Sequence, residues 1–377
     1  MTDYDWLIIG GGPHGRFAAA SIAAAVPAAR LAIIDPKPAL AAWRVRAGAC
    51  GMHYLRSSNA HHLGARADSL RRFAKAHGFD RADELGYYRR PSRALFEAHA
   101  EKALAGLTRI DDRADRIERY ADGWRVHTTS RDYYNTARLV LALGPSAPYR
   151  PHWAAGCEHV YDVDFDMSTS EATRIVVIGG GITGAQLALR LHERGHAVCW
   201  VTRSQPRRAD FDSDPCYAGP RCLTPFAETP IEERTALLAK ARQPGTLPPD
   251  VFARMTAALA AGDIAWRRGH VVSKDDDGLV FDDGRRLDAD RVILATGFEN
   301  HARPDSLLGA TIDALNLRCD RDGHVFINDD LEAAPGLHLL GRPASLQLGP
   351  MAGNIKGARL AAIRLTGVAR HGARNAV

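Results

Sequence analysis

Residues 5–23 read DWLIIGGGPHGRFAAASIA, and this stretch decides the fold. An apolar strand, Trp6–Ile9, runs into the spacing Gly10-x-Gly12-x-x-Gly15 and then into a run of small and apolar residues typical of a helix. In this context Gly10 permits a tight turn, Gly12 lets backbone approach a pyrophosphate, and Gly15 lets helix and strand pack closely. The helix N-terminus offers free N–H groups and partial positive charge to the phosphates. The pattern predicts a dinucleotide site.

The next strand supplies an acidic residue where such a site needs one. It reads LAIID and ends at Asp35, 20 residues after Gly15. A carboxylate at this place accepts hydrogen bonds from both hydroxyls of a ribose. Because strand, glycine turn, helix and acid agree, we predict that Asp35 binds the ribose of the first dinucleotide.

A second stretch repeats this plan in the middle of the chain. Residues 174–195 read RIVVIGGGITGAQLALRLHERG, and the strand that follows reads HAVCWVTR. The glycines of this second fingerprint are Gly179, Gly181 and Gly184. The strand ends in Thr202 and Arg203 instead of an acid, and a guanidinium binds a 2′-phosphate that a carboxylate would repel. We therefore predict NADPH rather than NADH here; the alternative is that Arg203 only solvates a loop.

Two later strands complete the plan. Residues 138–143 read RLVLAL before Gly144, and residues 291–295 read RVILA before Thr296 and Gly297. We predict an α/β fold with two Rossmann-like domains, the second inserted in the first. The first domain comprises residues 1–160 and 288–377, and the second comprises residues 165–285 with a helical insert at about 231–261.

The composition is that of a globular protein. The 377 residues are enough for two domains, and 46% of them are hydrophobic and 25% charged. The net charge is +5, but acids and bases alternate, so we expect no nucleic-acid partner. The chain enters its first strand without a basic leader, and Pro27 and Arg30 interrupt the Ala-rich stretch 17–34. We expect no signal peptide, no membrane span and a cytoplasmic location, with the oligomeric state left open.

Six cysteines are present, and no two of them form a CxxC pair. They lie at positions 50, 157, 199, 216, 222 and 319. The spacing of Cys216 and Cys222 favours neither zinc nor a redox disulfide. We therefore expect free thiols in a reducing compartment, and no metal site.

The two fingerprints together resemble the two-domain flavoproteins, which include disulfide reductases, flavin-containing monooxygenases and N-hydroxylating monooxygenases. Residues 290–298 read DRVILATGF and are similar to the DxxxLATGY motif of the N-hydroxylating enzymes. Trp43 and Gly51–Met52 fall where that family has a Trp-His…Gly-Met stretch, and residues 88–99, YRRPSRALFEAH, are similar to its Pro-x-Arg-x-x-Phe helix entrance. The resemblance implies FAD at the first site and NADPH at the second.

Departures from these families narrow the choice. Disulfide reductases need a cysteine pair beside the flavin, and none is spaced for it here. Their Gly-Asp pair near the C-terminus is Gly341–Arg342 in this chain. The lysine that holds the substrate carboxylate in the N-hydroxylating family is replaced near His61 and His62, so ornithine and lysine are not assigned as substrates.

The resemblance also implies which residues surround the flavin. Leu55–Asn59 resembles the Leu-x-Thr-Asn segment of flavin-containing monooxygenases, whose asparagine faces flavin and nicotinamide. Asn59 is the first catalytic candidate, and Arg56, His61 and His62 join it as pocket residues; a structural or exposed role for the histidines is the alternative. The polar loop 210–214 is either a substrate lid or a solvated loop.

A closing helix that starts near Ile355 follows Gly353 and Asn354. In this group such a helix points its N-terminus at the pyrimidine edge of the flavin, where it stabilises negative charge. A simple N-cap by Asn354 is compatible with that role. The full set of predicted cofactor-binding residues is Gly10, Gly12, Gly15, Asp35, Trp43, Gly144, Gly179, Gly181, Gly184, Thr202, Arg203, Thr296, Gly297, Gly341, Gly353 and Asn354.

By resemblance, the function is that of an FAD-dependent, NADPH-driven monooxygenase. It would use O2 to oxygenate a small nucleophilic nitrogen, sulfur or carbonyl substrate through a flavin C4a-(hydro)peroxide. One alternative is an NADPH-dependent reductase that passes electrons to a quinone or protein acceptor. Another is a non-catalytic flavin redox sensor, against which the two intact fingerprints argue because a sensor needs no hydride donor site.

Overall fold

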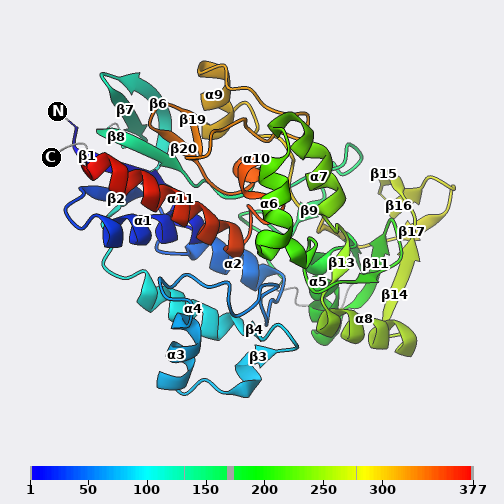
Figure 1. Ribbon diagram of the computed structural model, residues 1–377. Helices are drawn as coiled ribbons and strands as arrows, with labels where there is room; N and C mark the ends of the chain where they lie inside the picture. Colours follow the sequence, from blue (N-terminus) through cyan, green and yellow to red (C-terminus); the bar gives the residue numbers. More distant parts are fainter. Residues whose placement is uncertain (1, 131, 168–173, 277, 375–377) are drawn as a thin grey trace.

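The computed structural model describes residues 2–130, 132–167, 174–276 and 278–374, which form two main sheets (Figure 1). The strands of the first sheet are β1 (Tyr4–Ile9), β2 (Leu31–Ile34), β5 (Arg109–Ile110), β6 (Ala114–Tyr120), β7 (Gly123–Thr128), β8 (Tyr133–Leu141), β19 (Glu332–Ala334) and β20 (Leu337–Leu339). Those of the second are β9 (Glu158–His159), β10 (Arg174–Ile178), β11 (Ala197–Thr202), β14 (Ile264–Arg268) and β18 (Arg291–Leu294). The predicted α/β class with two Rossmann-type units is confirmed.

The first sheet has the order β19-β20-β8-β1-β2-β5, with β6 and β7 continuing from β8. β1 lies parallel to both β2 and β8, so that Ile8 faces Ile33 on one side and Val140 on the other. These side chains are fully buried, as the near-continuous apolar run of a parallel strand covered on both faces requires. The glycine helix α1 (Pro13–Ala25) packs against the long last helix α11 (Ile355–Arg374) (Figure 1).

The second sheet has the order β14-β11-β10-β18-β9 and is parallel throughout. In the middle of it, Val176 of β10 faces Cys199 of β11 and Val292 of β18. Helix α5 (Ile182–Glu193) follows β10 and packs against α8 (Pro249–Ala261). A three-stranded antiparallel sheet of β15 (Val271–Asp275), β16 (Gly278–Phe281) and β17 (Arg286–Asp288) extends from this unit.

Two strands of the second sheet lie beyond the domain boundaries drawn from the sequence. Those boundaries assign β9 and β18 to the first domain, whereas β18 pairs with β10 and β9 pairs with β18. The run Val292–Leu294 is apolar on both faces, so it is buried as an inner strand between β10 and β9. We therefore propose that the inserted domain extends from about 158 to 294.

The segment between β11 and β14 is more structured than the sequence indicates. Residues 204–230, which are polar and rich in proline, contain the short strand β12 (Arg207–Arg208) and the helix α6 (Pro220–Glu228), which has Pro220 in its first turn. The expected helical stretch 231–261 is divided into α7 (Arg234–Ala241) and α8, with β13 (Thr246–Leu247) between them. The remaining elements are α2 (Ala41–Ala49), α3 (Ser69–Ala76), β3 (Glu84–Leu85), β4 (Arg90–Pro91), α4 (Arg93–Ala103), α9 (Leu307–Ala314) and α10 (Ser345–Leu348).

The expectation of free thiols throughout was wrong for one pair. Cys216 and Cys222 form a disulfide, with their Cα atoms 5.4 Å apart. The 3₁₀ turn Pro215–Ala218 and the first turn of α6 reverse the chain, which brings together two cysteines whose spacing fits no common motif. The other four cysteines are free thiols.

The described helices include none that is both long enough and apolar enough to cross a membrane.

Candidate active site

The first glycine turn has the geometry that a bound pyrophosphate needs. Gly10 adopts a φ of 111°, and a Cβ atom there would collide with the carbonyl oxygen of Ala142. Gly12 faces open space, with no atom within 4 Å of a Cβ position. A Cβ on Gly15 would collide with the carbonyl oxygen of Gly10. The close approach of α1 to the end of β1 therefore requires glycine at position 15. These three positions fit the diphosphate of FAD.

Asp35 stands beside this turn at the end of β2. Its Oδ2 accepts the N–H of Gly11 at 2.5 Å, and its Oδ1 accepts the N–H of Lys37 at 2.8 Å. Both bonds fix the carboxylate next to the glycine turn, at the carboxyl edge of the sheet. This placement fits the ribose role that the sequence predicts for Asp35.

The second glycine turn repeats the geometry of the first. Gly179 has a φ of 143°, and a Cβ atom there would collide with the carbonyl oxygen of Ala295, while Gly181 faces open space. A Cβ on Gly184 would collide with the carbonyl oxygen of Gly179. The indole N–H of Trp200 donates to that same oxygen at 2.7 Å and holds the turn in place. The second turn thus fits a second dinucleotide.

Thr202 ends β11 with its hydroxyl already engaged. Its Oγ1 donates to the carbonyl oxygen of Ser204 at 2.7 Å and accepts the indole N–H of Trp266 at 3.0 Å. The side chain is almost fully buried, whereas that of Arg203 is exposed. The hydrogen bonds of Thr202 therefore stabilise the end of β11, and the exposed side chain of Arg203 is accessible to solvent and ligands.

A basic cavity of about 530 Å³ opens at this strand end. It is lined by Gln205, Trp266, Arg267, Arg268 and Arg285. Arg268 lies directly beside Thr202 in the parallel register of β11 and β14. Sequence reasoning missed Arg267 and Arg268, although a pair of arginines that ends a strand of the same sheet was a usable signal.

The two later glycines, Gly144 and Gly297, occupy matching places after β8 and β18. Their φ angles are 80° and 85°, which only glycine adopts freely. The N–H of Tyr149 donates to the carbonyl oxygen of Gly297 at 3.0 Å, and the Thr296 hydroxyl donates to the carbonyl oxygen of Tyr149. Tyr149 follows β8 of the first sheet, and Gly297 follows β18 of the second. These two bonds therefore hold the end of β8 against the end of β18.

Arg56 joins the two units instead of facing open space. Its guanidinium donates to the carbonyl oxygens of Ala209, Asp210 and Phe211 at 2.8–3.2 Å. It also donates to the carbonyl oxygen and the hydroxyl of Thr246, at 3.0 and 2.8 Å. Burial lowers the pKa of Arg56 to about 10, which leaves it charged at neutral pH. Arg56, a predicted catalytic candidate, thus donates to five acceptors, and its bonds to Asp210 and Phe211 hold the start of the loop 210–214 in place.

Asn59, the first catalytic candidate, lies against a hairpin. Its Nδ2 donates to Oε1 of Glu84 in β3 at 3.0 Å, and its backbone N–H donates to the carbonyl oxygen of Tyr88 at 3.3 Å. Glu84 is also bound by the guanidinium of Arg89. The carbonyl oxygen of the Asn59 amide accepts no described hydrogen bond, so this atom is available to a ligand.

The two histidines of this segment differ in their surroundings. His62 is fully buried; its Nδ1 accepts the N–H of Gly64 at 3.1 Å, and its Nε2 lies 3.0 Å from the carbonyl oxygen of Ala67. His61 is half-buried, and its burial near Lys356 and Arg359 lowers its pKa to about 4. His62 therefore has a structural role, and His61 is a half-buried imidazole close to Lys356 and Arg359 of α11.

Three segments meet at the start of α11. Oδ1 of Asn354 accepts the N–H groups of Lys356 and Gly357 at 3.0 and 3.2 Å, so Asn354 is the N-cap. Nη1 of Arg359 donates to the carbonyl oxygens of His62 and Gly64 at 2.8 and 2.9 Å. Nε2 of His14, inside the first fingerprint, lies 2.9 Å from the carbonyl oxygen of Ala352. His14 is a site residue that sequence reasoning missed, although its place inside the glycine motif was the signal.

The other predicted cofactor residues lie at the edges of this region. Trp43 packs on Phe96 with ring centres 5.2 Å apart. Gly341 has a φ of 80° and precedes the turn of Arg342, whose Nη2 donates to Oδ1 of Asn300 at 2.5 Å. Gly353 is exposed, and the Arg342 side chain lies 3.8 Å from where its Cβ would be. Arg342 thus borders the loop before α11 at the place where related reductases carry an acid.

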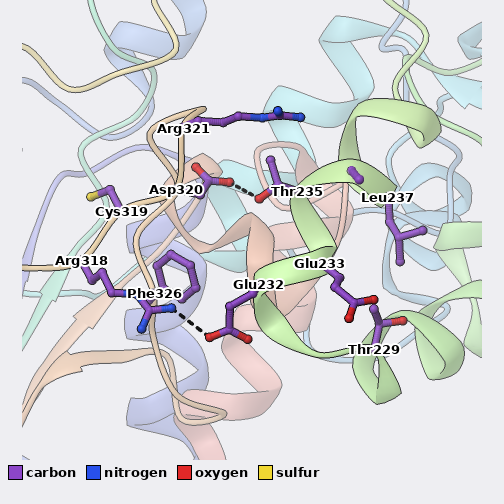
Figure 2. Close-up of a pocket in the computed structure, with 11 residues that line it drawn as sticks. Thr229, Glu232, Glu233, Thr235, Leu237, Arg318, Cys319, Asp320, Arg321 and Phe326 are labelled. Atoms are coloured by element: carbon purple, nitrogen blue, oxygen red, sulfur yellow. Dashed lines mark hydrogen bonds and ion pairs between the residues drawn. The ribbon is translucent and has the colours of Figure 1, made fainter.

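A larger cavity of about 850 Å³ lies between α7 and the loop 318–326 (Figure 2). Figure 2 shows the pairs Arg318–Glu232, at 2.9 Å, and Thr235–Asp320, at 2.5 Å, that join its two walls. The cavity contains none of the predicted cofactor residues. Ligand atoms of Asp320, Asp322 and His324 lie within 4.8 Å of one another there. Because four donors already bind the two oxygens of Asp320, we assign no metal to this cluster.

A sequence profile of the pyridine nucleotide-disulphide oxidoreductases matches residues 4–352. The chain belongs to this family. It is therefore an oxidoreductase of the class that binds FAD and a nicotinamide dinucleotide, and the two glycine turns have the backbone geometry that such cofactors need.

Several relatives of this oxidoreductase are known. An NADH dehydrogenase-like protein of Mycobacterium tuberculosis is 29% identical over 196 residues, 45% of this chain and 47% of the relative, so the chain spans about half the length of the curated relatives it matches. The ornithine N-hydroxylase of Kutzneria sp. 744, with reduced FAD, NADP+ and L-ornithine, has a TM-score of 0.79 at 18% identity, covering 99% of this chain and 100% of its own. The L-lysine 6-monooxygenase of Pseudomonas syringae has a TM-score of 0.74 at 18% identity, covering 98% and 99%.

Proposed function

We propose that this oxidoreductase is an FAD- and NADPH-dependent monooxygenase that oxygenates a small nucleophilic substrate. The observation that carries the proposal is the course of residues 55–64. Arg56 ties this segment to the loop of the second unit, and Arg359 ties its other end to the start of α11. The segment therefore connects the inserted unit with the first turn of α11, and this course supports a meeting place of hydride donor and flavin ring beside it.

The side chains of this segment suit a shielded reaction. Bound FAD supplies the chemistry that accepts a hydride from NADPH and activates O2. The free amide oxygen of Asn59 accepts a hydrogen bond, and its Nδ2 is oriented by Glu84. Burial lowers the pKa of His61 to about 4, so this imidazole is neutral at physiological pH and can accept a hydrogen bond there. Helix α11 directs its capped N-terminus at the same region, where it favours negative charge.

The choice of NADPH is supported by the basic cavity at the end of β11. Arg267 and Arg268 line it, and Arg203 is exposed at the end of the neighbouring strand. A 2′-phosphate binds guanidinium groups in a bidentate manner, whereas the ribose hydroxyl of NADH gains little from three nearby cations. The 2′-phosphate of NADPH is thus the ligand that this cluster suits.

The reductase alternative also has support in the comparisons. The curated relative from Mycobacterium tuberculosis is NADH dehydrogenase-like, a name that describes electron transfer and no oxygenation. It matches less than half of this chain, whereas the two N-hydroxylating enzymes share the fold over nearly the whole length. The monooxygenase is therefore the leading proposal.

One experiment separates the two functions. The FAD-loaded protein is mixed with NADPH in air and given either a panel of primary amines, thioethers and ketones or a soluble quinone. A monooxygenase consumes O2 in proportion to the oxygenated product that it forms from one substrate class, and added quinone hardly changes the rate of NADPH oxidation. Rapid NADPH oxidation that needs quinone and yields no oxygenated product would establish the reductase instead.

A further inference from the structure

Arg46 carries a charge that the described part of the chain leaves unpaired. It lies on α2, and its guanidinium makes no hydrogen bond or ion pair with any described residue. The neighbouring Arg44 contacts Glu97 and Glu101, at 3.5 and 3.6 Å. Arg93 is also paired with Glu97, at 3.4 Å. Arg46 differs from both because no described carboxylate pairs with its guanidinium.

The surroundings of Arg46 belong to both units. Its Nη1 lies 3.7 Å from where a Cβ of Gly144 would be, at the end of β8. Its guanidinium carbon lies 5.7 Å from the centre of the Phe298 ring, just after β18. Because the carboxyl ends of parallel strands are where dinucleotides bind in this class of fold, Arg46 lies at the junction of the two cofactor regions.

A chain of contacts leads from Arg46 to the second fingerprint. The Phe298 ring stacks on Tyr161, with centres 5.1 Å apart and planes 6° from parallel. The Tyr161 hydroxyl lies 3.0 Å from Oγ1 of Thr183, and Thr183 is inside the motif Gly179-x-Gly181-x-x-Gly184. The cation is thus linked through two side chains to the first turn of α5, whose N–H groups are oriented to bind phosphate.

An unpaired, half-buried guanidinium is costly unless a ligand supplies negative charge. Burial lowers the pKa of Arg46, and Tyr161 is the one group that acts to raise it. An arginine remains charged under such conditions, so the charge needs an anion of matching shape. A diphosphate satisfies it, since its oxygens accept two N–H groups of a guanidinium at once.

We propose that Arg46 of the first unit binds the diphosphate of NADPH held at the second glycine turn. This inference rests on the proposed NADPH site. FAD presents the same chemical group, and Gly144 beside Arg46 belongs to the first unit, but the series of side-chain contacts through Phe298, Tyr161 and Thr183 leads from Arg46 to the second fingerprint. The hydride donor would thereby be clamped by residues of both units.

The test measures binding to the oxidised, FAD-loaded protein, without turnover. NADP+ and NAD+ are titrated into the wild type, Arg46→Met and Arg46→Lys, and binding is followed by calorimetry and by the flavin absorbance spectrum. Loss of one charge-assisted contact should raise the Kd of Arg46→Met about 10- to 100-fold. Because the diphosphate is common to both nucleotides, the factor should be the same for NADP+ and NAD+, and Arg46→Lys should recover part of it. Arg44→Met, two residues away on the same helix with its charge paired, is the matched control and should bind both nucleotides like the wild type.

Three results would overturn the inference. Unchanged Kd values in Arg46→Met would remove Arg46 from the site. Weaker binding of NADP+ alone would place it at the 2′-phosphate, and loss of FAD with normal NADP+ affinity would place it at the FAD diphosphate. None of these readouts depends on oxygen, so a failed monooxygenase assay leaves the test of Arg46 intact.

Discussion

Nη2 of Arg56 lies 2.8 Å from Oγ1 of Thr246, a contact that crosses from the segment after α2 to the strand β13 of the inserted unit. Arg90 makes a second crossing, because its guanidinium pairs with Asp250 of α8. On the other side of the molecule, Nη1 of Arg234 in α7 donates to the carbonyl oxygen of Leu346 at 2.8 Å. The two units are thus fixed to each other by the buried Arg90 and Arg234 and the half-buried Arg56, and of these Arg56 and Arg234 donate chiefly to backbone carbonyls.

Replacing Arg56 should weaken this junction. Arg56→Met leaves the carbonyl oxygens of residues 209–211 and 246 without their donor, and we expect a loss of about 2–4 kcal/mol in the free energy of unfolding. Urea unfolding followed by circular dichroism measures it. Arg89→Met, whose exposed guanidinium pairs with Glu84, is the control and should change stability by less than about 1 kcal/mol. Equal losses in the two variants would contradict the structural role of Arg56.

Asp35 should be needed for FAD affinity. Asp35→Ala removes a carboxylate that the Gly11 and Lys37 N–H groups fix beside the first turn. Loss of a charged ribose contact should weaken FAD binding by about 1.5–3 kcal/mol. Reconstitution of the apoprotein with FAD, followed by flavin fluorescence, gives the Kd. Asp111→Ala, at an exposed carboxylate paired with Arg109, is the control; an undiminished affinity in Asp35→Ala would remove this residue from the site.

Arg268 should set the preference for NADPH. In Arg268→Ala we expect the KM for NADPH to rise about 10-fold or more, because one guanidinium contact to the 2′-phosphate is lost, and the KM for NADH to stay constant. Arg203→Ala should likewise reduce the preference for NADPH over NADH. Steady-state flavin reduction with each nucleotide measures both values, and Arg254→Ala, on the exposed face of α8, serves as control. A wild type that prefers NADH would refute the assignment of this cavity.

Asn59→Asp should uncouple NADPH oxidation from product formation. The added carboxylate brings negative charge to the place where reduced oxygen species form, so hydrogen peroxide should replace oxygenated product while FAD content stays the same. The substitution also sets two carboxylates against each other, since Asn59 Nδ2 donates to Glu84 at 3.0 Å. The double variant with Glu84→Gln relieves that repulsion. If the double variant forms as much oxygenated product per NADPH as the wild type, the effect of Asn59 comes only from its contact with Glu84 in the hairpin.

Acid should destabilise the fold below about pH 6.5. Burial lowers the pKa of both His99 and His159 to about 4. Between these values and the ordinary pKa of about 6.5, the unfolded chain binds protons that the folded chain does not, so the free energy of unfolding falls as pH falls from 6.5 to 4. We expect the Tm of His159→Gln and His99→Gln to fall less steeply over this range than that of the wild type. The exposed His77→Gln should keep the wild-type slope, and identical slopes in all four proteins would disprove the assignment.

The fold was predictable because its determinants are local. The two glycine motifs, the apolar strands before them and the acid at Asp35 lie within short windows, and each acts through backbone geometry that the residue types dictate. The assignment of β9 and β18 was harder, because β9 is only two residues long and the apolar β18 suits either sheet, so that only the pairing decides.

The candidate site was harder to predict because its parts come from distant segments. Arg268 is far from Arg203 in sequence and becomes its neighbour only through the register of β11 and β14. Arg56 lies in a segment rich in polar residues, but its partners are backbone carbonyls, which no sequence motif reports. The Cys216–Cys222 bond depends in the same way on a turn and a helix start that propensities alone did not reveal.

The packing of α1 on α11 has a consequence for biosynthesis. Strand β20, which pairs with β8, and helix α11, which covers α1, are the last parts of the first unit to leave the ribosome. The sheet of the inserted unit, from β9 to β18, is complete in the nascent chain well before them. During translation the inserted unit therefore has all its strands before the first unit does, and the first unit can complete its packing only once α11 has been made.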